Sequence, residues 1–502
     1  MSDQQRASPI NDHAALVEHF DVLIVGAGLS GIGAGHAVQT HCKGRSYAIL
    51  EGREAIGGTW DLFRYPGVRS DTDMYTLGYS FRPWVHCESM GAGATILQYV
   101  RDTAREFGID RHIRYHHRVR AASWSSAQSR WTVQVDTGEV PDGSPQIMYT
   151  CNFLHLCGGY YDYGEGFSPE FAGREDFEGE VVHPQFWPPA LDYTGKNVVV
   201  LGSGATAVTL VPAMSDKAAH VTMLQRSPSY VVSLPSRDSL ANAMHRWLPT
   251  TLAHRLARMK SVAFAVAFFQ LCRRNPAFAK KALRAGVAKA LPPTFDVDAH
   301  FKPRYEPWDE RVCFVRDGDL FKAVSAGRAS IVTDSIDRFT PDGLLLKSGQ
   351  SIPADIVVTA TGLKLTTCAG MSFSVDGRPI DLGKTYAYQG LMLSGVPNLA
   401  FCVGYTNASW TLRADLVSRY VTRLINFMGQ KGYRSCTPTC DDESSMKPEP
   451  LIGLRSGYVL RSVASFPKQG AEAPWRMAQN YYVDLVKMRF RSVVDKNLHF
   501  AQ

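Results

Sequence analysis

The sequence has little that could build a disulfide framework, a metal centre or a redox-active cysteine pair. Its ten cysteines are spread over 502 residues without any CxxC pair, and the nearest approach is Cys436 with Cys440. This pattern is typical of reduced thiols in a cytoplasmic protein and excludes a disulfide scaffold. It also argues against a disulfide reductase, which needs a cysteine pair close to its flavin. We predict no metal site.

Long apolar runs are absent as well. The longest candidate, Ser261 to Cys272, falls short of the ~18–20 residues that cross a bilayer. The first twenty residues are polar and lack the apolar core of a secretory signal. The sequence therefore predicts a cytoplasmic protein without a spanning helix.

Acidic residues are missing from one stretch, residues 239–290, which holds ten lysines and arginines. The net charge of the chain is +7, so the remainder is slightly acidic and no general nucleic-acid-binding surface is expected. Because the stretch is rich in Ala, Leu and Met, we predict a helical insertion. Two interpretations of its charge stay open: an ordinary solvated face, or a basic face that associates the protein peripherally with anionic lipid.

Two strand–glycine–helix–strand units lie far apart in the chain, with strands at residues 20–25 and 47–50 and again at 197–201 and 220–224. Each unit is typical of a doubly wound parallel sheet. The length exceeds what one core usually supports. We predict an α/β protein with two Rossmann-like dinucleotide-binding domains. Residues 1–160 and 355–502 form the first, discontinuous domain, and residues 161–354, including the insertion 239–290, form the second.

The first glycine-rich turn predicts the binding site for FAD. Gly26, Gly28 and Gly31 match GxGxxG directly after a strand. The first glycine permits the turn, the second lets the backbone approach a pyrophosphate, and the third allows close packing of helix on strand. Glu51 ends the second strand, where a carboxylate accepts hydrogen bonds from ribose hydroxyls.

The second turn predicts the binding site for NADPH. It runs through Gly202, Ser203, Gly204, Ala205, Thr206 and Ala207, with alanine at the third glycine position. After the following strand come Arg226 and Ser227 instead of an acid. A guanidinium and a hydroxyl at this place suit the 2′-phosphate of NADPH.

One further motif carries a resemblance to a known family. Phe177, Gly179, His183 and Trp187 fit FxGxxxHxxxW, and this stretch resembles the signature of Baeyer–Villiger monooxygenases among the class B flavoprotein monooxygenases. Residues 57–60 (GGTW), 64–67 (RYPG) and 404–411 (GYTNASWT) are similar to the ethionamide-activating branch, which oxidises ketones and thioamides. The resemblance extends over nearly the whole chain.

The resemblance assigns roles to individual residues. Ser30, Glu51, Thr59, Trp60, Asp61, Leu62, Asp71 and Val119 are expected to contact FAD. Arg311 matches the mobile active-site arginine of the family, with Asp71 as the carboxylate that positions it. Glu310 departs from the pattern because many relatives have a lysine there, so NADPH preference rests on Arg226 and Ser227. A helix is expected to begin at Trp410 and direct its dipole at the flavin.

The implied reaction uses NADPH and O2 to convert aliphatic or arylalkyl ketones to esters through a C4a-peroxyflavin, with oxidation of sulfides as a side activity. Arg311 is the expected cation beside the peroxide. The loop from Pro292 to Pro307 and the region of Trp475 are candidates for a lid that excludes water. The alternatives are S- or N-oxygenation without insertion into a ketone and, in another class, a non-catalytic flavin-binding module.

Overall fold

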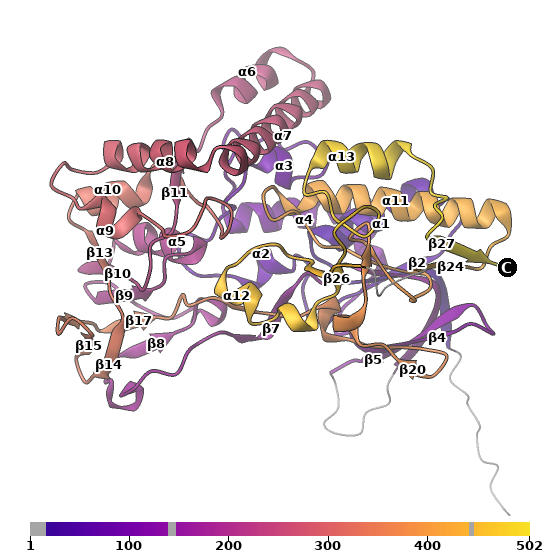
Figure 1. The fold of residues 1–502 in the computed structure, drawn as a ribbon, viewed down its shortest axis with the longest axis horizontal. Coiled ribbons are helices and arrows are strands. Elements are labelled where there is room, and N and C mark those ends of the chain that lie inside the picture. The colour runs from indigo at the N-terminus through magenta and orange to yellow at the C-terminus, as the bar shows by residue number, and fades with distance from the viewer. Residues whose placement is uncertain (1–16, 139–146, 441–445) are drawn as a thin grey trace, which may run out of the picture.

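The computed structural model describes residues 17–138, 147–440 and 446–502. These residues form two large sheets side by side, each covered by helices, and several small sheets of two or three strands (Figure 1). The first sheet has nine strands and the second has five. The expectation that the chain lacks a signal core concerns residues that lie mostly outside the described ranges.

The first sheet joins a parallel Rossmann-like half to an antiparallel extension. Its strands, in the spatial order β20-β19-β4-β5-β6-β1-β2-β3 with β23 also beside β6, are Arg378–Pro379, Ser372–Val375, Arg118–Ser125, Arg130–Asp136, Ile147–Leu156, Glu18–Val25, Tyr47–Leu50, Ile113–Arg114 and Leu399–Phe401. β1 pairs in parallel with β2 and β6, whereas β5 is antiparallel to β4 and β6. The continuous apolar run of β1 is explained by its central position, where both faces are buried.

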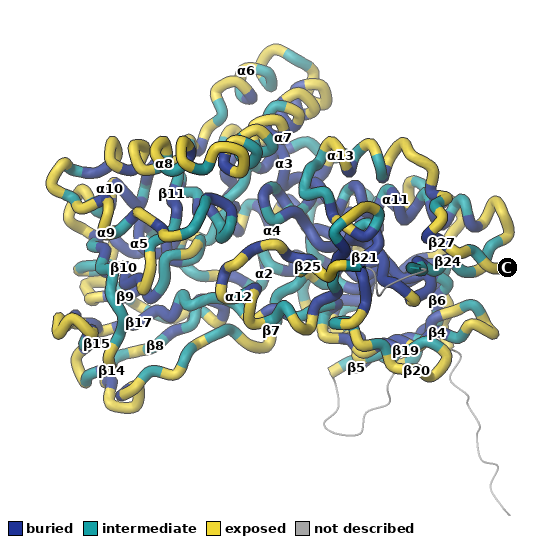
Figure 2. Tube along the Cα trace, in the orientation of Figure 1, coloured by how far each residue is buried: buried dark blue, intermediate teal, exposed yellow. Residues whose placement is uncertain are grey.

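Helices α1 (Leu29–His41), α4 (Gly93–Glu106) and α11 (Trp410–Lys431) pack with β1 and β2 in one large core. A second core lies around Trp124, Trp131 and Phe373 of the antiparallel extension. Figure 2 shows both as the dark interior of this domain. The C-terminal α11 therefore completes the domain that the N-terminal strand begins.

The second sheet is fully parallel, with β13 (Ala329–Thr333), β10 (His220–Gln225), β9 (Asn197–Leu201), β17 (Ile356–Val358) and β8 (Glu180–Val182) in that order. Helices α5 (Ala205–Met214) and α10 (Asp319–Ser325) belong to its core. The predicted pair of dinucleotide-binding folds is confirmed. One boundary is corrected: the division at residue 354/355 gave the strand after it to the first domain, but β17 pairs with β8 and β9 of the second.

The chain crosses between the two sheets at two adjacent strands. β7 (Tyr161–Gly166) and β18 (Leu363–Leu365) pair with each other in antiparallel fashion and belong to neither large sheet. A double connection of this kind restricts the relative motion of the two domains.

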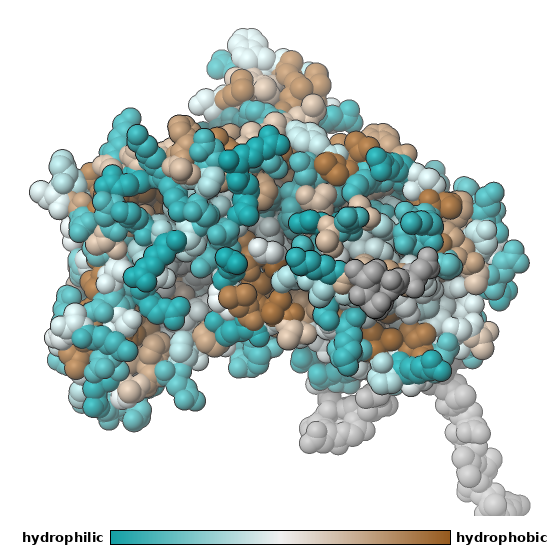
Figure 3. All heavy atoms as spheres, viewed as in Figure 1, coloured by the Kyte–Doolittle hydropathy of each residue, from teal (hydrophilic) through white to brown (hydrophobic). Residues whose placement is uncertain are grey.

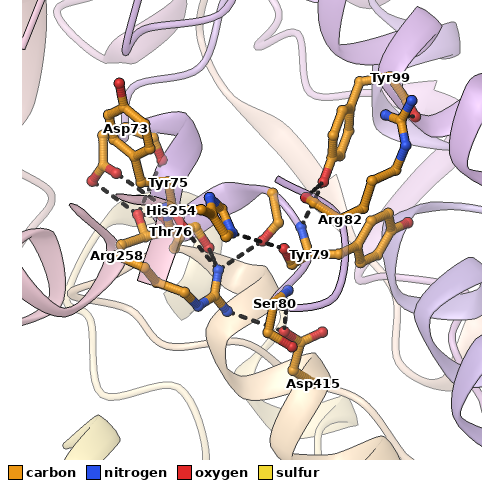
Figure 4. Close-up of polar contacts among 12 residues, drawn as sticks. Asp73, Tyr75, Thr76, Tyr79, Ser80, Arg82, Tyr99, His254, Arg258 and Asp415 are labelled. Carbon is orange, nitrogen blue, oxygen red and sulfur yellow. Dashed lines mark hydrogen bonds and ion pairs between the residues drawn. The ribbon is translucent and has the colours of Figure 1, made fainter. Parts of the chain in front are cut away.

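The insertion is helical as predicted, with α6 (Ser239–Trp247), α7 (Thr250–Arg274) and α8 (Pro276–Ala290). Although it interrupts the second domain, α7 packs on the first. Arg258 of α7 is buried and donates hydrogen bonds to the carbonyl oxygens of Tyr75 and Gly78 at 2.9 and 2.8 Å, and to the Asp415 carboxylate at 3.0 Å (Figure 4). His254, one turn earlier, lies 3.2 Å from the carbonyl oxygen of Tyr79. The insertion thus connects the domains.

Candidate active site between the two domains

A large cavity of about 1120 Å³ lies where the domains and the insertion meet. Its wall is formed by the loops after β1, β2 and β6, by the start of α5 and α11, by α7, and by the turn that carries Arg311. In open α/β sheets ligands bind beyond the carboxyl ends of the strands, and this cavity has that position in the first domain.

The first glycine-rich turn has the backbone that its motif requires. Gly26 has a φ of +99°, and a Cβ on it would lie 2.8 Å from the carbonyl oxygen of Cys157. A Cβ on Gly31 would lie 1.8 Å from the carbonyl oxygen of Gly26, so helix α1 approaches the strand as closely as predicted. Gly28 is the N-cap of α1 and lines the cavity, whereas Gly31 supports the turn from behind.

Glu51 lies at the end of β2 with its carboxylate buried at the cavity wall. One oxygen accepts the N–H of Ala27 at 2.7 Å and the other accepts the N–H of Arg53 at 3.0 Å. Burial raises the pKa of Glu51, although these hydrogen bonds act in the opposite direction. Each carboxylate oxygen keeps acceptor capacity for a ribose hydroxyl. The cradle of Gly26, Gly28 and Glu51 therefore fits an adenosine diphosphate moiety such as that of FAD.

Most of the other predicted flavin contacts also line this cavity: Ser30, Thr59, Trp60, Leu62, Asp71 and Val119. Ser30 accepts a hydrogen bond at 2.8 Å from the indole N–H of Trp410, the first residue of α11. The expected start of a helix at this residue is confirmed, and the N-terminus of α11 opens on the cavity.

Asp61 does not line the cavity. Its carboxylate is 1% exposed and pairs with Arg53 at 2.7 Å, Arg64 at 3.2 Å and Arg101 at 3.5 Å. The sequence expectation of a flavin contact is therefore corrected for this side chain, because three guanidinium groups surround it instead. Its position gives it the role of holding the short helix α2 (Thr59–Leu62), whose neighbouring residues do face the cavity.

Arg311 and Asp71 meet at the cavity wall, although 240 positions separate them in the chain. Nη1 of Arg311 donates to the Asp71 carboxylate at 3.2 Å, and both side chains are 35% exposed. Burial alone would lower the pKa of Arg311, but the Asp71 carboxylate raises it well above its usual value. A guanidinium has five N–H donors, and this bond uses one of them. The arrangement provides a permanent positive charge beside the cavity.

Hydroxyl groups tie the Asp71 loop to α11. Ser409 donates to the Thr72 hydroxyl at 2.8 Å and lies 2.6 Å from the Thr76 hydroxyl, which in turn donates to Asp73 at 2.9 Å. All four residues line the cavity. The network fixes the loop that carries Asp71 relative to the N-terminus of α11.

The part of the cavity beside Arg311 is apolar and aromatic. Tyr160 directly precedes β7 and Tyr161 begins it. Both lie near Arg311, and Tyr160 stacks on Trp410 with ring centroids 4.9 Å apart. The remaining apolar wall comes from the insertion and the second domain, through Phe264, Ala265, Phe268, Trp308 and Phe314. Of these apolar and aromatic residues only Trp410 received a role from the sequence, as the start of a helix. The aromatic run Tyr160, Tyr161 and Tyr163, at the start of β7, was the one available signal.

The second glycine-rich turn lies at the N-terminus of α5, as predicted. Gly202 has a φ of +135°, and a Cβ on Gly204 would meet no atom within 4 Å, so the backbone there is open to a ligand. Ala205 and Thr206 line the cavity, but Gly202, Ser203, Gly204 and Ala207 do not. Arg226 and Ser227 are exposed beyond the end of β10, outside the cavity. This geometry fits a nucleotide that lies across the edge of the second sheet with one end in the cavity.

Glu310 lies close enough to Arg226 for the guanidinium to oppose the rise in its pKa, which burial causes. The carboxylate that departs from the family pattern therefore faces the arginine expected to hold the 2′-phosphate. An anion bound by Arg226 would therefore be repelled by the Glu310 carboxylate.

The signature residues Phe177, Gly179, His183 and Trp187 do not line the cavity. Nδ1 of His183 accepts the N–H of Gln185 at 3.2 Å, which leaves Nε2 to donate to the carbonyl oxygen of Gly362 at 3.4 Å. Gly362 directly precedes β18, and the imidazole also packs against Gly166 of β7. The signature histidine therefore acts on the double connection between the domains.

The prediction that two segments form a lid over the cavity is wrong. Between Pro292 and Pro307, Phe295, Val297 and Phe301 pack in or against the core of the second domain. Trp475 is buried against Tyr388 in the core of the first domain, at a centroid distance of 5.6 Å. Neither segment lines the cavity, because their apolar side chains are used for packing.

Comparison with known proteins agrees with this architecture. A family model for an NAD(P)-binding Rossmann-like domain matches residues 24–84, and one for flavin-binding monooxygenase-like proteins matches residues 84–263. The FAD-containing monooxygenase EthA of Mycobacterium tuberculosis is 51% identical over 97% of this chain and 99% of its own length. The chain belongs to the class B flavoprotein monooxygenases.

Solved structures show which fold this member of the family has. Cyclohexanone monooxygenase in an open form is 18% identical, with a TM-score of 0.74 over 97% of this chain and 100% of that one. Oxidised steroid monooxygenase bound to NADP is 21% identical, with a TM-score of 0.73 over 96% and 100%. The predicted flavoprotein monooxygenase, with EthA among its relatives, is confirmed, and the non-catalytic alternative is excluded. The fold is that of these two monooxygenases.

The cofactors predicted from the two turns, FAD and NADPH, agree with those named for these monooxygenases. Among the described residues no group of His, Cys, Asp or Glu could hold a metal ion. Within the same ranges no helix is long and apolar enough to cross a membrane.

Proposed function

We propose that this monooxygenase carries out Baeyer–Villiger oxidation: a ketone, O2, NADPH and a proton give an ester, NADP+ and water. The observation that carries the proposal is the Arg311–Asp71 pair on the wall of an apolar cavity. Aliphatic and arylalkyl ketones suit that wall. Oxidation of sulfides is the expected side activity.

Bound FAD, reduced by NADPH, supplies the chemistry that activates O2. Gly26, Gly28, Ser30 and Glu51 would hold its adenosine part, and Thr59, Trp60, Leu62 and Val119 line the continuation of the same cradle. Ala205, Thr206, Arg226 and Ser227 would hold NADPH on the second domain.

Arg311 supplies a positive charge where an oxygen nucleophile must attack a carbonyl carbon. That attack places negative charge on oxygen, and a guanidinium stabilises it through directed hydrogen bonds at every relevant pH. Asp71 orients the guanidinium by accepting one of its N–H groups. Attack on sulfur creates no carbonyl oxyanion, so the position of Arg311 favours ketone insertion over S- or N-oxygenation alone.

The aromatic wall excludes water from the reacting groups. Phe268, Trp308 and Phe314 place apolar surface on the side of the cavity formed by the insertion and the second domain. A dry site strengthens the electrostatic effect of Arg311 and keeps a reactive oxygen species from being released as hydrogen peroxide.

The test uses purified, FAD-loaded protein with NADPH, air and either a methyl ketone or a thioether. We expect ester and sulfoxide from the wild type. Arg311→Ala should retain NADPH consumption, lose ester formation by about 100-fold or more, and release hydrogen peroxide instead. Sulfoxide formation should fall much less.

Arg304→Ala is the matched control, because Arg304 lies in the same segment as Arg311, between Phe301 and Cys313. Arg304 is exposed and lies outside the cavity. Ester formation by Arg311→Ala at the level of the control would remove Arg311 from this role. Sulfoxide without any ester from a range of ketones in the wild type would favour the S-oxygenating alternative.

A further inference from the structure

The outward face of α7 is apolar, which is unusual for a helix at a protein surface. Leu252, Leu256, Met259, Ala263, Ala267 and Leu271 are all exposed and follow one another at spacings of three or four residues. Residues at this spacing lie on one side of a helix. From the first to the last, the row extends for about 28 Å at 1.5 Å per residue. We call this row the apolar stripe.

Neighbouring helices extend the apolar surface. Leu240 and Trp247 of α6 and Phe278 of α8 are exposed large side chains, and Trp247 is 78% exposed. Figure 1 shows that α6 and the start of α7 project from the body of the protein, and apolar side chains gather on this projection in Figure 3. An exposed apolar surface of this extent, on a projecting element, is typical of an interaction site.

The charge of the same segment indicates the partner. Of its ten basic residues, Arg258, Lys260, Arg273, Lys280 and Arg284 pair with acids supplied by other parts of the chain. The five others are Arg246, Arg255, Arg274, Lys281 and Lys289, and none of them forms an ion pair with any residue that the structure describes. Residues 239–290 contain no acid. Uncompensated positive charge therefore surrounds the apolar stripe.

We propose that α6, α7 and α8 form a docking surface for an anionic lipid bilayer. Apolar side chains that enter the interface between head groups and acyl chains, together with basic side chains beside them, are the two features by which an amphipathic helix binds lipid. In this proposal the protein lies on the surface of the bilayer.

Charge also argues against the other occupant of an exposed apolar face, a second copy of the chain. A two-fold symmetric contact through this face would bring each basic segment against its own copy. Arg255 and Arg274, which have no ion-pair partner within the described ranges, would then face like charges. Anionic lipid head groups remove that repulsion, whereas a second copy adds to it.

The docking surface adjoins the cavity. Phe264 lies beside the apolar stripe, is 58% exposed and also lines the cavity, together with Ser261, Ala265 and Phe268 of the same helix. The cavity therefore opens where the lipid would lie. If the proposed ketone oxidation holds, substrates dissolved in the bilayer reach the site without crossing water. Docking itself does not depend on that reaction.

The test is sedimentation of the FAD-loaded protein with vesicles of phosphatidylcholine that contain about 30% phosphatidylglycerol. We expect binding to these vesicles at low salt, much weaker binding at 0.5 M salt, and little binding to pure phosphatidylcholine. The double variant Arg255→Glu/Arg274→Glu should bind at least about 25-fold more weakly, since each basic residue near an anionic surface contributes about fivefold.

Two controls separate specific docking from general effects. Lys43→Glu/Arg111→Glu makes the same change in net charge at exposed positions outside the segment and should bind like the wild type. Leu256→Ser/Met259→Ser should also lose binding, whereas Phe490→Ser, which removes a more exposed apolar side chain elsewhere, should not. FAD content and the unfolding temperature report on the fold of each variant.

Three results would overturn the proposal: no sedimentation with anionic vesicles, equal binding by the two charge-reversed variants, or equal binding by Leu256→Ser/Met259→Ser and Phe490→Ser. A dimer in sedimentation velocity that Leu256→Ser/Met259→Ser dissociates would assign the face to a second copy instead. None of these measurements uses ester formation, so failure of docking and failure of the proposed reaction can be distinguished.

Discussion

Arg273 of α7 pairs with Asp309 at 2.7 Å, and Asp309 lies two residues before Arg311. A second ion pair of 2.6 Å joins Lys280 of α8 to Glu306 in the same turn. Between them, Trp308 has a φ of +72°, a conformation that a bulky residue holds only when its surroundings fix it. The helical insertion therefore helps to position the turn that carries the active-site cation.

Removing the ion pair between Arg273 and Asp309 should affect the coupling of NADPH oxidation to ester formation more than it affects the stability of the protein. Both partners of the pair are partly exposed, so Arg273→Ala should change the free energy of unfolding by less than about 1 kcal/mol. We expect a several-fold rise in the share of NADPH oxidised to hydrogen peroxide, because the Arg311 turn becomes less fixed. Peroxide and ester yields measure this share.

Arg284→Ala provides the comparison for that prediction. Arg284 pairs with Asp298 at 2.7 Å on the same insertion, away from the turn. Peroxide release that rises equally in Arg284→Ala and Arg273→Ala would show that the ion pair between Arg273 and Asp309 has no particular role.

The facing charges of Glu310 and Arg226 predict a weak preference for NADPH. Glu310→Gln removes a carboxylate that repels the 2′-phosphate, so the Kd for NADP+ should fall about fivefold or more while that for NAD+ changes little. Arg226→Ala should weaken NADP+ binding by at least about tenfold, again with little change in the Kd for NAD+. Titration of the flavin spectrum with each nucleotide gives both constants, and parallel changes for the two nucleotides would contradict the assignment.

A buried ion pair joins α11 to the C-terminal segment of the first domain. Arg413 of α11 is fully buried and pairs with Asp484, which also accepts the Tyr405 hydroxyl at 2.8 Å. Asp484→Ala leaves that guanidinium without its carboxylate and should lower the free energy of unfolding by about 3–5 kcal/mol.

Two variants check the cause of that loss. Tyr405→Phe removes only one hydrogen bond and should cost about 1 kcal/mol. Arg413→Met/Asp484→Leu removes both charges and should recover much of the stability. Denaturant unfolding measures all three, and a double variant no better than Asp484→Ala would contradict an electrostatic origin.

Two buried histidines predict a loss of stability at acidic pH. Burial lowers the pKa of His155 and of His254 to about 4, from 6.5 in the unfolded chain. Because the folded state favours the neutral imidazole, the free energy of unfolding has its full value above pH 6.5 and decreases as the pH falls towards 4. At pH 5 each group costs about 2 kcal/mol. Unfolding free energies at pH 7 and pH 5 should show a smaller difference for His155→Gln than for the wild type, and an unchanged difference would contradict this account.

The local sequence determined the parts of this protein that depend on neighbouring residues. The two glycine-rich turns, the strand before each of them, the carboxylate of Glu51 and the helical character of residues 239–290 could all be predicted, since each rests on backbone geometry or helix propensity over a short span. The pattern of Phe177, Gly179, His183 and Trp187 indicated the family, but not the place of His183 against the double connection.

Tertiary structure decided whatever depends on pairs distant in the chain. Only the fold places Asp71 beside Arg311, surrounds Asp61 with three guanidinium groups, assigns β17 to the second sheet, and buries the two segments expected to form a lid. The alternation of apolar and polar residues and the propensity for helix or strand carry no information about which distant side chains meet. An apolar segment has the same sequence pattern whether it covers a site or fills a core. The apolar stripe of α7 is the clearest case: its spacing is visible in the sequence, but only packing determines which face of the helix remains exposed.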